Sequence, residues 1–303
     1  VGFFFLPESP RWLAMSGKVA EAEEVLKLVH DRQDVSGPLR DILNAIAKED
    51  GKRDSSAGLA GSIRAGLDQL SAIWCSKQTR RAALLGIGLM AMNQFSGINT
   101  VMCYSTTILI DAGFSRDASI WLAALCGATQ LVGVFVSVAS MDSLGRRPTA
   151  LRSCVGAVLT LIALALSFWC KGAFWDDVKV AALMLYLVAF GSGLSGVPWV
   201  MNSEIYPLPL RSAAVGQATV ACWVFNFFVG RYFLSICEHM GTGGAFSIFA
   251  CFSIVGGVWM YFMLPETKGL ELEAIGSLFE DPYPKSWSGG VTYSEQESEE
   301  GSW

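Results

Sequence analysis

Histidine is almost missing from this sequence, and its scarcity excludes several kinds of catalytic site. Only 2 of the 303 residues are histidine, so no histidine zinc motif and no Ser-His-Asp arrangement can be assembled. The 8 cysteines contain no pair spaced C-x-x-C, and they fall in or near separate apolar runs, which is typical of small core residues rather than metal ligands. We therefore expect no catalytic residues, no metal ion and no cofactor, and we do not expect an enzyme.

Charge is also sparse. Charged residues make up 16% of the chain and hydrophobic residues 52%, whereas about a quarter of a typical soluble domain is charged. The mean hydropathy is +0.42, which indicates a membrane protein with the lipid bilayer as its main partner. The net charge of -5 comes largely from the C-terminal tail. Since no basic patch with interleaved aromatic residues is present, we expect no nucleic-acid partner.

Six apolar runs approach the roughly 20 residues that a helix needs to cross a bilayer. They cover residues 82–110, 120–141, 149–170, 180–203, 214–237 and 245–264. An even number of spans returns the chain to its starting side. Lysine and arginine gather in the loops of one side, so the positive-inside rule places both termini in the cytoplasm. We predict a multi-pass integral membrane protein of either the plasma membrane or the vacuolar membrane.

The other segments complete the predicted domain organisation. Residues 1–6 resemble the end of a membrane helix, and residues 7–81 a cytoplasmic connector with short helices at 19–29, from Pro38 onward and at 62–74, the last two separated by a linker at 51–61. Residues 82–264 form the six-helix bundle, 265–279 a short cytoplasmic helix and 280–303 an acidic disordered tail. P-E-S at residues 7–9 and P-E-T at 265–267 each follow an apolar helix, which hints at a duplicated unit.

The first span carries an unusual density of amides, with N-Q-F-S-G-I-N at residues 93–99. Amides buried without partners cost about 1–3 kcal/mol each, so several on one segment indicate a polar cavity. On a straight helix Gln94 and Asn99 would point about 140° apart, and Gly97 between them offers a bend. The alternative is that these side chains only join neighbouring helices by hydrogen bonds.

The fourth span is interrupted by Gly191, Gly193, Gly196 and Pro198. Such residues are tolerated in membrane helices where neighbouring helices or a cavity satisfy the freed backbone groups, so we predict a bend beside a cavity. A carboxylate at membrane depth is costly, so Glu204 needs an interface or a basic partner, of which Arg211 is the nearest in the sequence. The alternative is a plain kinked helix with a charged end.

These motifs together resemble those of the sugar porter family of the major facilitator superfamily. The matching segments are P-E-S-P-R-W-L at residues 7–13, Q-F-S-G-I-N at 94–99, D-S-L-G-R-R at 142–147, P-W-V-M-N-S-E at 198–204 and P-E-T-K-G at 265–269. Their details are most similar to the proton/myo-inositol cotransporters of that family. Departures include Asn93 in place of a first glutamine and Cys103 in place of a tyrosine. The resemblance implies an all-α membrane protein, the C-terminal six-helix half of a twelve-helix fold preceded by connector helices.

The resemblance also implies roles for individual residues. The substrate-binding residues would be Gln94, Asn99, Tyr104, Gln130, Trp199, Asn202, Trp223 and Asn226. The cytoplasmic gate would consist of Asp142, Arg146, Arg147, Glu204, Arg211 and Glu266. Charges of both signs at helix ends would form the ion pairs that open and close this gate.

The function that follows is a transmembrane carrier of a small neutral polyhydroxylated solute by alternating access. We expect a sugar or polyol, with myo-inositol or a hexose first, transported either together with protons or alone. The chain corresponds to the second half of a full porter, so transport would require the missing N-terminal half. Two alternatives are a sugar sensor that does not transport and an inactive truncated fragment.

Overall fold

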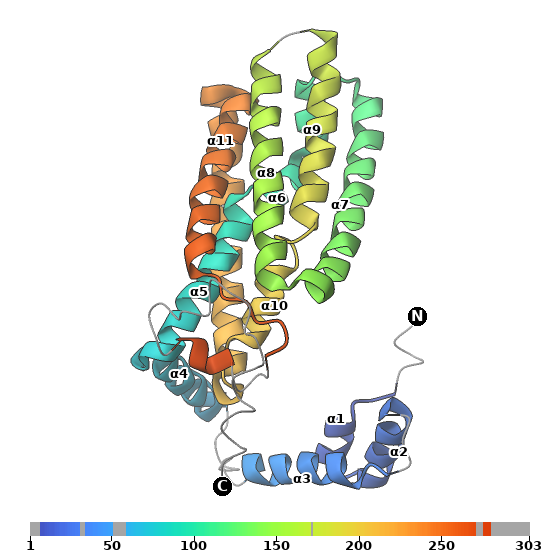
Figure 1. Cartoon of the computed structure of the whole chain (residues 1–303), viewed down its shortest axis with the longest axis vertical. Coiled ribbons are helices and arrows are strands. Elements are labelled where there is room, and N and C mark those ends of the chain that lie inside the picture. The colour runs from blue at the N-terminus through green and yellow to red at the C-terminus, as the bar shows by residue number, and fades with distance from the viewer. Residues whose placement is uncertain (1–6, 31–33, 51–58, 171, 271–274, 280–303) are drawn as a thin grey trace, which may run out of the picture. The chain divides into compact units, whose positions relative to one another are not determined.

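The structure, a computed structural model, describes residues 7–30, 34–50, 59–170, 172–270 and 275–279. Within these ranges every regular element is a helix and there is no strand (Figure 1). The chain divides into two compact units, Val1–Gly66 and Leu67–Trp303. The stub predicted at residues 1–6, most of the linker predicted at 51–61 and the tail predicted at 280–303 lie outside the described residues.

The described residues of the first unit form α1 (Pro10–Met15), α2 (Val19–His30), α3 (Ser36–Asp50) and the beginning of a fourth helix that continues into the second unit. Ser9 caps α1 by accepting a 3.1 Å hydrogen bond at Oγ from the backbone N–H of Trp12, which is a standard helix start. Helix α2 coincides with the amphipathic helix predicted at residues 19–29, and α3 begins two residues before Pro38. The apolar faces of these helices share a small core of Leu13, Ala14, Ala22, Val25, Leu39, Ile42 and Ile46.

The second unit is a helical bundle (Figure 1). Its elements are α4 (Leu59–Cys75), whose last residues belong to it, α5 (Lys77–Phe95), α6 (Ile98–Asp111), α7 (Arg116–Leu144), α8 (Arg146–Trp169), α9 (Ala173–Gly191), α10 (Val197–Glu204), α11 (Leu208–Met263) and the 3-10 helix η2 (Gly276–Phe279). Helix α8 packs against both α9 and α11, while α5 packs on α11 and α7 on α9. The large side chains of Tyr186, Phe190 and Phe246 are fully buried in the resulting core.

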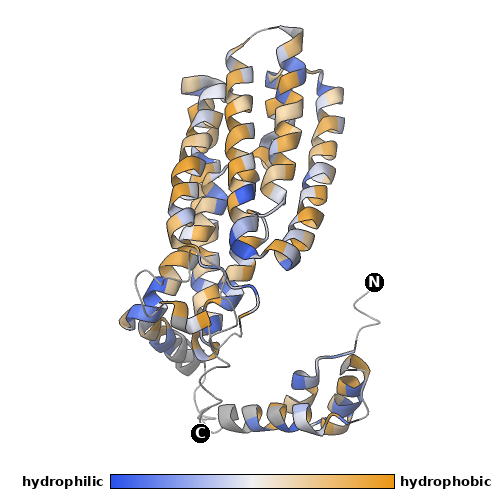
Figure 2. Cartoon of the chain, viewed as in Figure 1, coloured by the Kyte–Doolittle hydropathy of each residue, from blue (hydrophilic) through white to orange (hydrophobic). Residues whose placement is uncertain are grey.

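Three of the described helices, α7, α8 and α11, are long and apolar enough to cross a membrane. Figure 2 shows hydrophobic residues along these helices and hydrophilic ones gathered at the N-terminal end of α8. Large apolar side chains such as Trp121 and Phe135 point outward, with exposed fractions of 78% and 67%. An outward apolar surface is expected of helices whose surroundings are lipid.

The structure divides two of the predicted spans. The runs at 82–110 and 180–203 each consist of two helices, α5 with α6 and α9 with α10, because the backbone breaks at Gly97 and again over residues 192–196. The runs at 214–237 and 245–264 lie in the two parts of α11, on either side of Gly241, whose φ of 74° is not helical. Of the short helix predicted at 265–279, the described residues contain η2, which packs on α5.

Candidate functional site

The break between α5 and α6 depends on Gly97. Its φ of 86° lies in the left-handed region, which glycine adopts without a steric penalty. A Cβ at this position would lie 2.4 Å from Cδ2 of Phe249, so the ring leaves no room for a side chain. The Tyr186 hydroxyl donates a 2.8 Å hydrogen bond to the carbonyl oxygen of Ser96, which satisfies a backbone group that the break sets free.

This break brings the predicted amides together. Oε1 of Gln94 accepts hydrogen bonds from Nδ2 of Asn99 at 2.8 Å and from Nδ2 of Asn226 at 2.9 Å. Nε2 of Gln94 donates to Oδ1 of Asn93 at 2.9 Å and to Sγ of Cys222 at 3.0 Å. Gln94 is 4% exposed, while Asn99 and Asn226 are half-buried. We call Asn93, Gln94, Asn99 and Asn226 the amide cluster; it joins α5, α6 and α11.

The second break, between α9 and α10, is held by side chains from two other helices. The Leu194 N–H donates a 2.9 Å hydrogen bond to Oγ of Ser153 on α8, and the Leu194 carbonyl accepts a 2.8 Å hydrogen bond from Nδ2 of Asn93. A Cβ at Gly193 would lie 2.5 Å from the carbonyl oxygen of Thr149, so only glycine allows α8 to approach this closely. The predicted bend is present, and Asn93 ties it to the amide cluster.

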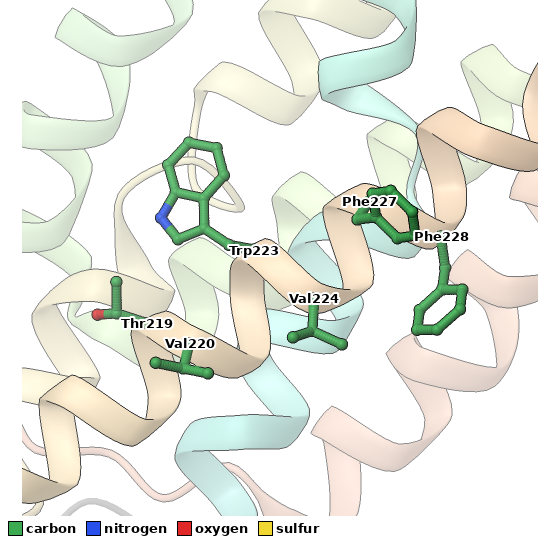
Figure 3. A pocket seen from close by; sticks show the side chains of 6 residues that line it. All are labelled: Thr219, Val220, Trp223, Val224, Phe227 and Phe228. Carbon is green, nitrogen blue, oxygen red and sulfur yellow. The ribbon is translucent and has the colours of Figure 1, made fainter.

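The two predicted tryptophans are both exposed. Trp199 on α10 is 42% exposed and Trp223 on α11 is 62% exposed. Trp223 contributes to an apolar surface pocket of about 440 Å³ that is lined by Thr219, Val220, Trp223, Val224, Phe227 and Phe228. All six side chains come from α11 (Figure 3). Neither indole hydrogen-bonds to the amide cluster, so the structure leaves both rings free to meet another molecule.

Asn202 is placed differently from the other predicted substrate residues. It is 0% exposed, and its Nδ2 donates to the carbonyl oxygens of Gly86 and Pro198 at 3.2 and 2.8 Å. Its Oδ1 accepts a 3.0 Å hydrogen bond from the Tyr206 hydroxyl. Because both amide hydrogens are already used, Asn202 ties α10 to α5 instead of joining the amide cluster.

Tyr104 and Gln130 also lie apart from the amide cluster. The Tyr104 ring stacks on Phe233, with centroids 5.4 Å apart. Gln130 is half-buried on α7, where its backbone carbonyl oxygen lies 3.0 Å from the position of a Cβ at Gly191. These positions belong to the packing of α6 on α11 and of α7 on α9. Neither side chain forms a hydrogen bond with the amide cluster within the described residues, so their roles in substrate binding stay predictions.

An ion pair joins α8 to α10 at the end of the bundle. Glu204 Oε1 accepts hydrogen bonds from Nε and NH2 of Arg146 at 3.3 and 2.9 Å. The two side chains are only 22% and 17% exposed. Arg211 is not the partner that its place in the sequence suggests, because its Nε and NH2 donate to the Tyr206 carbonyl at 3.1 and 3.0 Å. Tertiary packing thus selects Arg146, 58 residues away in the chain.

Glu266 caps the start of α8. Its two carboxylate oxygens accept hydrogen bonds from the backbone N–H groups of Arg146 and Arg147, each at 2.9 Å. A carboxylate at a helix N-terminus is stabilised by the free N–H groups and the helix dipole. The next residue, Thr267, donates a 2.6 Å hydrogen bond to Oε2 of Glu204. Arg146, Glu204, Glu266 and Thr267 therefore form one connected network, which we call the gate network.

Two predicted gate residues lie beside this network. Arg147 donates from NH2 to the Tyr261 carbonyl at 2.8 Å, with its guanidinium carbon 5.6 Å from the Tyr261 ring centroid. Asp142 is exposed and forms no ion pair within the described residues. A groove of about 470 Å³ next to the gate network is lined by Arg146, Ser203, Glu204, Arg211, Thr267, Gly269, Leu270 and Ile275.

Sequence reasoning missed several residues that hold these sites. The sequence places Asn93 in the amide-rich segment without a role of its own and Cys222 among the small core residues, and it gives no role to Ser153 or Thr267. Thr267 had a signal, because it belongs to the P-E-T-K-G segment. Within the described residues no group of three or more His, Cys, Asp and Glu could hold a metal ion.

Comparison with known proteins places this bundle in a family. Residues 1–279 match the family described as "Sugar (and other) transporter". The human proton myo-inositol cotransporter is 29% identical over 92% of this chain and 55% of its own length. The plastidic glucose transporter 4 of Arabidopsis thaliana is 32% identical over 91% and 48%, and the major myo-inositol transporter IolT of Bacillus subtilis is 31% identical over 92% and 56%.

Solved structures agree with this assignment. The major facilitator superfamily proton:xylose symporter XylE, bound to 6-bromo-6-deoxy-D-glucose, superposes with a TM-score of 0.68 at 25% identity, covering 91% of this chain and 55% of XylE. The chain therefore spans about half the length of the relatives that it matches. Since the family match covers nearly the whole sequence, the chain is a multi-pass integral membrane protein and not an enzyme, and it belongs to the sugar transporter family of the major facilitator superfamily.

Proposed function

We propose that this chain supplies one half of a carrier that moves a small neutral sugar or polyol across a membrane by alternating access. The observation that carries the proposal is the amide cluster, in which Gln94 holds Asn99 and Asn226 from two other helices. Polar groups inside a membrane bundle are costly, and those that are present commonly mark a substrate or ion pathway. Amides match hydroxyl groups because each amide offers both a donor and an acceptor.

The solute that we propose first is myo-inositol, followed by a hexose. Two of the relatives are named for myo-inositol and one for glucose. A neutral hydrogen bond contributes about 0.5–1.5 kcal/mol, so about four of them with a stacking indole give an affinity near millimolar, which corresponds to about −4 kcal/mol. Such weak binding suits a carrier, because the bound solute must leave again. Proton coupling is proposed only by analogy with the relatives named as proton cotransporters.

The gate network is the proposed cytoplasmic lock. Arg146 on α8 and Glu204 on α10 are joined to the segment after α11 through Glu266 and Thr267. Three parts of this half are thus held together at one end of the bundle, where we propose that the charged side chains face the other half and close the path. From the lysine and arginine residues in the loops of one side, we also propose that both chain termini lie on the cytoplasmic side.

The opposite wall of the path is proposed to come from a preceding six-helix half. Carriers of this superfamily place the solute between two such halves. The exposed fractions of Trp199 and Trp223, 42% and 62%, are consistent with a surface that the other half would cover. It follows that the 303-residue chain alone would not transport.

The test is uptake of radiolabelled myo-inositol and glucose in transporter-deficient yeast. One arm expresses the 303-residue chain, and the other the same chain extended by the upstream sequence of its transcript. We expect saturable uptake only from the extended form. Uptake by the short chain alone would contradict the two-half proposal, and binding without uptake by either form would identify a sugar sensor.

The proposed binding site is tested in whichever form, the 303-residue chain or the extended chain, binds the solute. Gln94→Ala removes the acceptor of the half-buried amides of Asn99 and Asn226, so we expect Gln94→Ala and Asn99→Ala each to weaken solute binding by about 5- to 150-fold. Ser105→Ala is the matched control, since its buried hydroxyl donates only to the Met102 carbonyl of its own helix. If both amide variants bind every solute as tightly as the parent, the cluster serves helix packing and the proposed site is wrong.

A further inference from the structure

Asn93 lies where the two helix breaks meet. It is 5% exposed and sits near the end of α5, next to Gln94. Its Nδ2 donates to the Leu194 carbonyl at 2.8 Å, inside the break between α9 and α10. Its Oδ1 accepts the hydrogen bond from Nε2 of Gln94 at 2.9 Å. One small side chain therefore joins Gln94 of the amide cluster to the backbone of the other break.

The hydrogen bonds through Asn93 all run in one direction. Asn99 and Asn226 donate to Gln94, Gln94 donates to Asn93, and Asn93 donates to Leu194. Cys222 accepts the second hydrogen bond from Nε2 of Gln94, so the orientation of the Gln94 amide is fixed from two sides. If Asn99 or Asn226 rotates toward a solute, the hydrogen bonds of Gln94 change. The contacts of Asn93 with Gln94 then change as well.

The far end of this series is the break between α9 and α10. Residues 192–196 form turns there, and the Leu194 carbonyl accepts the hydrogen bond of Asn93 because the residue four positions on, Pro198, has no backbone N–H to donate. Helix α10, which follows directly, carries Trp199 and Glu204. A shift of Leu194 would therefore move the start of α10, and with it Trp199 and the gate residue Glu204.

We propose that Asn93 is a positioning residue that couples occupancy of the amide cluster to the conformation of the break between α9 and α10. This inference rests on the proposed function, because it assumes that a solute binds at Asn99 and Asn226. Asn93 itself does not need to touch the solute. Its two hydrogen bonds transmit a change at Gln94 to Leu194, and the change at Leu194 shifts α10.

The coupling can be read by a cysteine placed in the break. Ser195→Cys is a conservative change at a half-buried position, where the native hydroxyl donates to the Gly191 carbonyl. Trypsin cleaves after Lys179 and Arg211, and the peptide between these sites contains no native cysteine. Its alkylation rate can therefore be followed by mass spectrometry without interference from the 8 cysteines of the chain.

The experiment compares alkylation with and without saturating myo-inositol or glucose in the form that binds solute. In the Ser195→Cys parent we expect solute to change the rate by about 5-fold or more, the lower end of typical coupling between sites. Adding Asn93→Leu should abolish this change at solute concentrations that still saturate the site. Adding Asn93→Gln, which keeps an amide, should restore part of it, and Ser105→Ala should leave it intact.

The outcomes separate the two proposals. If no solute binds the parent, the proposed function fails. If solute binds but alkylation of the reporter does not respond, or if Asn93→Leu responds as the parent does, the coupling is wrong while the function stands. Should Asn93→Leu fail to accumulate, Asn93→Ala removes the same hydrogen bonds without adding volume and is judged by the same two outcomes.

Discussion

Replacing Gly97 by alanine should destabilise the bundle strongly for a change of one methyl group. The φ of 86° at this position costs a residue with a Cβ about 1–2 kcal/mol. The new Cβ would also lie 2.4 Å from Cδ2 of Phe249, and relieving such overlap by shifting the ring or the backbone typically costs about 1–3 kcal/mol. We therefore expect Gly97→Ala to lower the free energy of unfolding by about 2–5 kcal/mol.

A matched control is available on another helix. Gly127 lies within α7, and a Cβ there would meet no atom within 4 Å. Gly127→Ala should be neutral or stabilising by up to about 1 kcal/mol, because alanine favours a helix more than glycine does. The measurement is denaturant unfolding of both variants, purified in the same detergent micelles and followed by circular dichroism.

A double variant separates the two contributions. Phe249→Leu removes the ring edge, so Gly97→Ala should cost less in that background than in the parent, and the remaining cost reports the backbone conformation. Gly97→Ala should also weaken solute binding, because the break holds Gln94 beside Asn99. If Gly97→Ala is as stable as Gly127→Ala, the break does not require glycine and the reasoning fails.

Three further predictions concern the gate network and Asn202. Glu204→Gln in the complete carrier should change the uptake rate more than the equilibrium affinity, because the charge biases a two-state equilibrium; unaltered uptake kinetics at normal protein levels would contradict a gating role. Glu266→Gln should lower the free energy of unfolding by about 1–3 kcal/mol, since the backbone N–H groups of Arg146 and Arg147 lose a charged acceptor, and a thermal midpoint equal to that of the parent would be the contrary result. Asn202→Leu should lower the free energy of unfolding by about 1–3 kcal/mol and leave the solute affinity of the remaining folded protein unchanged. A selective loss of solute binding would instead show that Asn202 belongs to the binding site.

Much of the architecture could be predicted because it depends on local properties of the chain. The apolar runs, the amphipathic helices of the first unit and the breaks near Gly97 and Gly193 follow from hydropathy, periodicity and the conformational freedom of glycine. The helix ends were less predictable. Where the backbone breaks inside an apolar run, composition shows one span while the hydrogen bonds form two helices.

The candidate site was predictable only in part. The meeting of Gln94 and Asn99 follows from a bend at Gly97, and the structure confirms that their amides touch. The burial of Asn202 could not be predicted, because it depends on the packing of α10 against α5. That packing brings Asn202 to Gly86, which is 116 residues away in the sequence, while Tyr206 bonds its other side-chain atom. The sequence alone does not distinguish an asparagine whose amide faces a cavity from one whose amide joins two helices.

Composition and motifs are properties of the chain read in order, so they suffice to identify a helical membrane protein of the sugar transporter family. Tertiary packing sets the partner of each polar group. It paired Glu204 with Arg146 rather than with the nearer Arg211, and it placed Asn93 between Gln94 and Leu194. The physical reason is that hydrogen bonds act over about 3 Å, so their partners are selected by the packing of helices that lie far apart in the sequence.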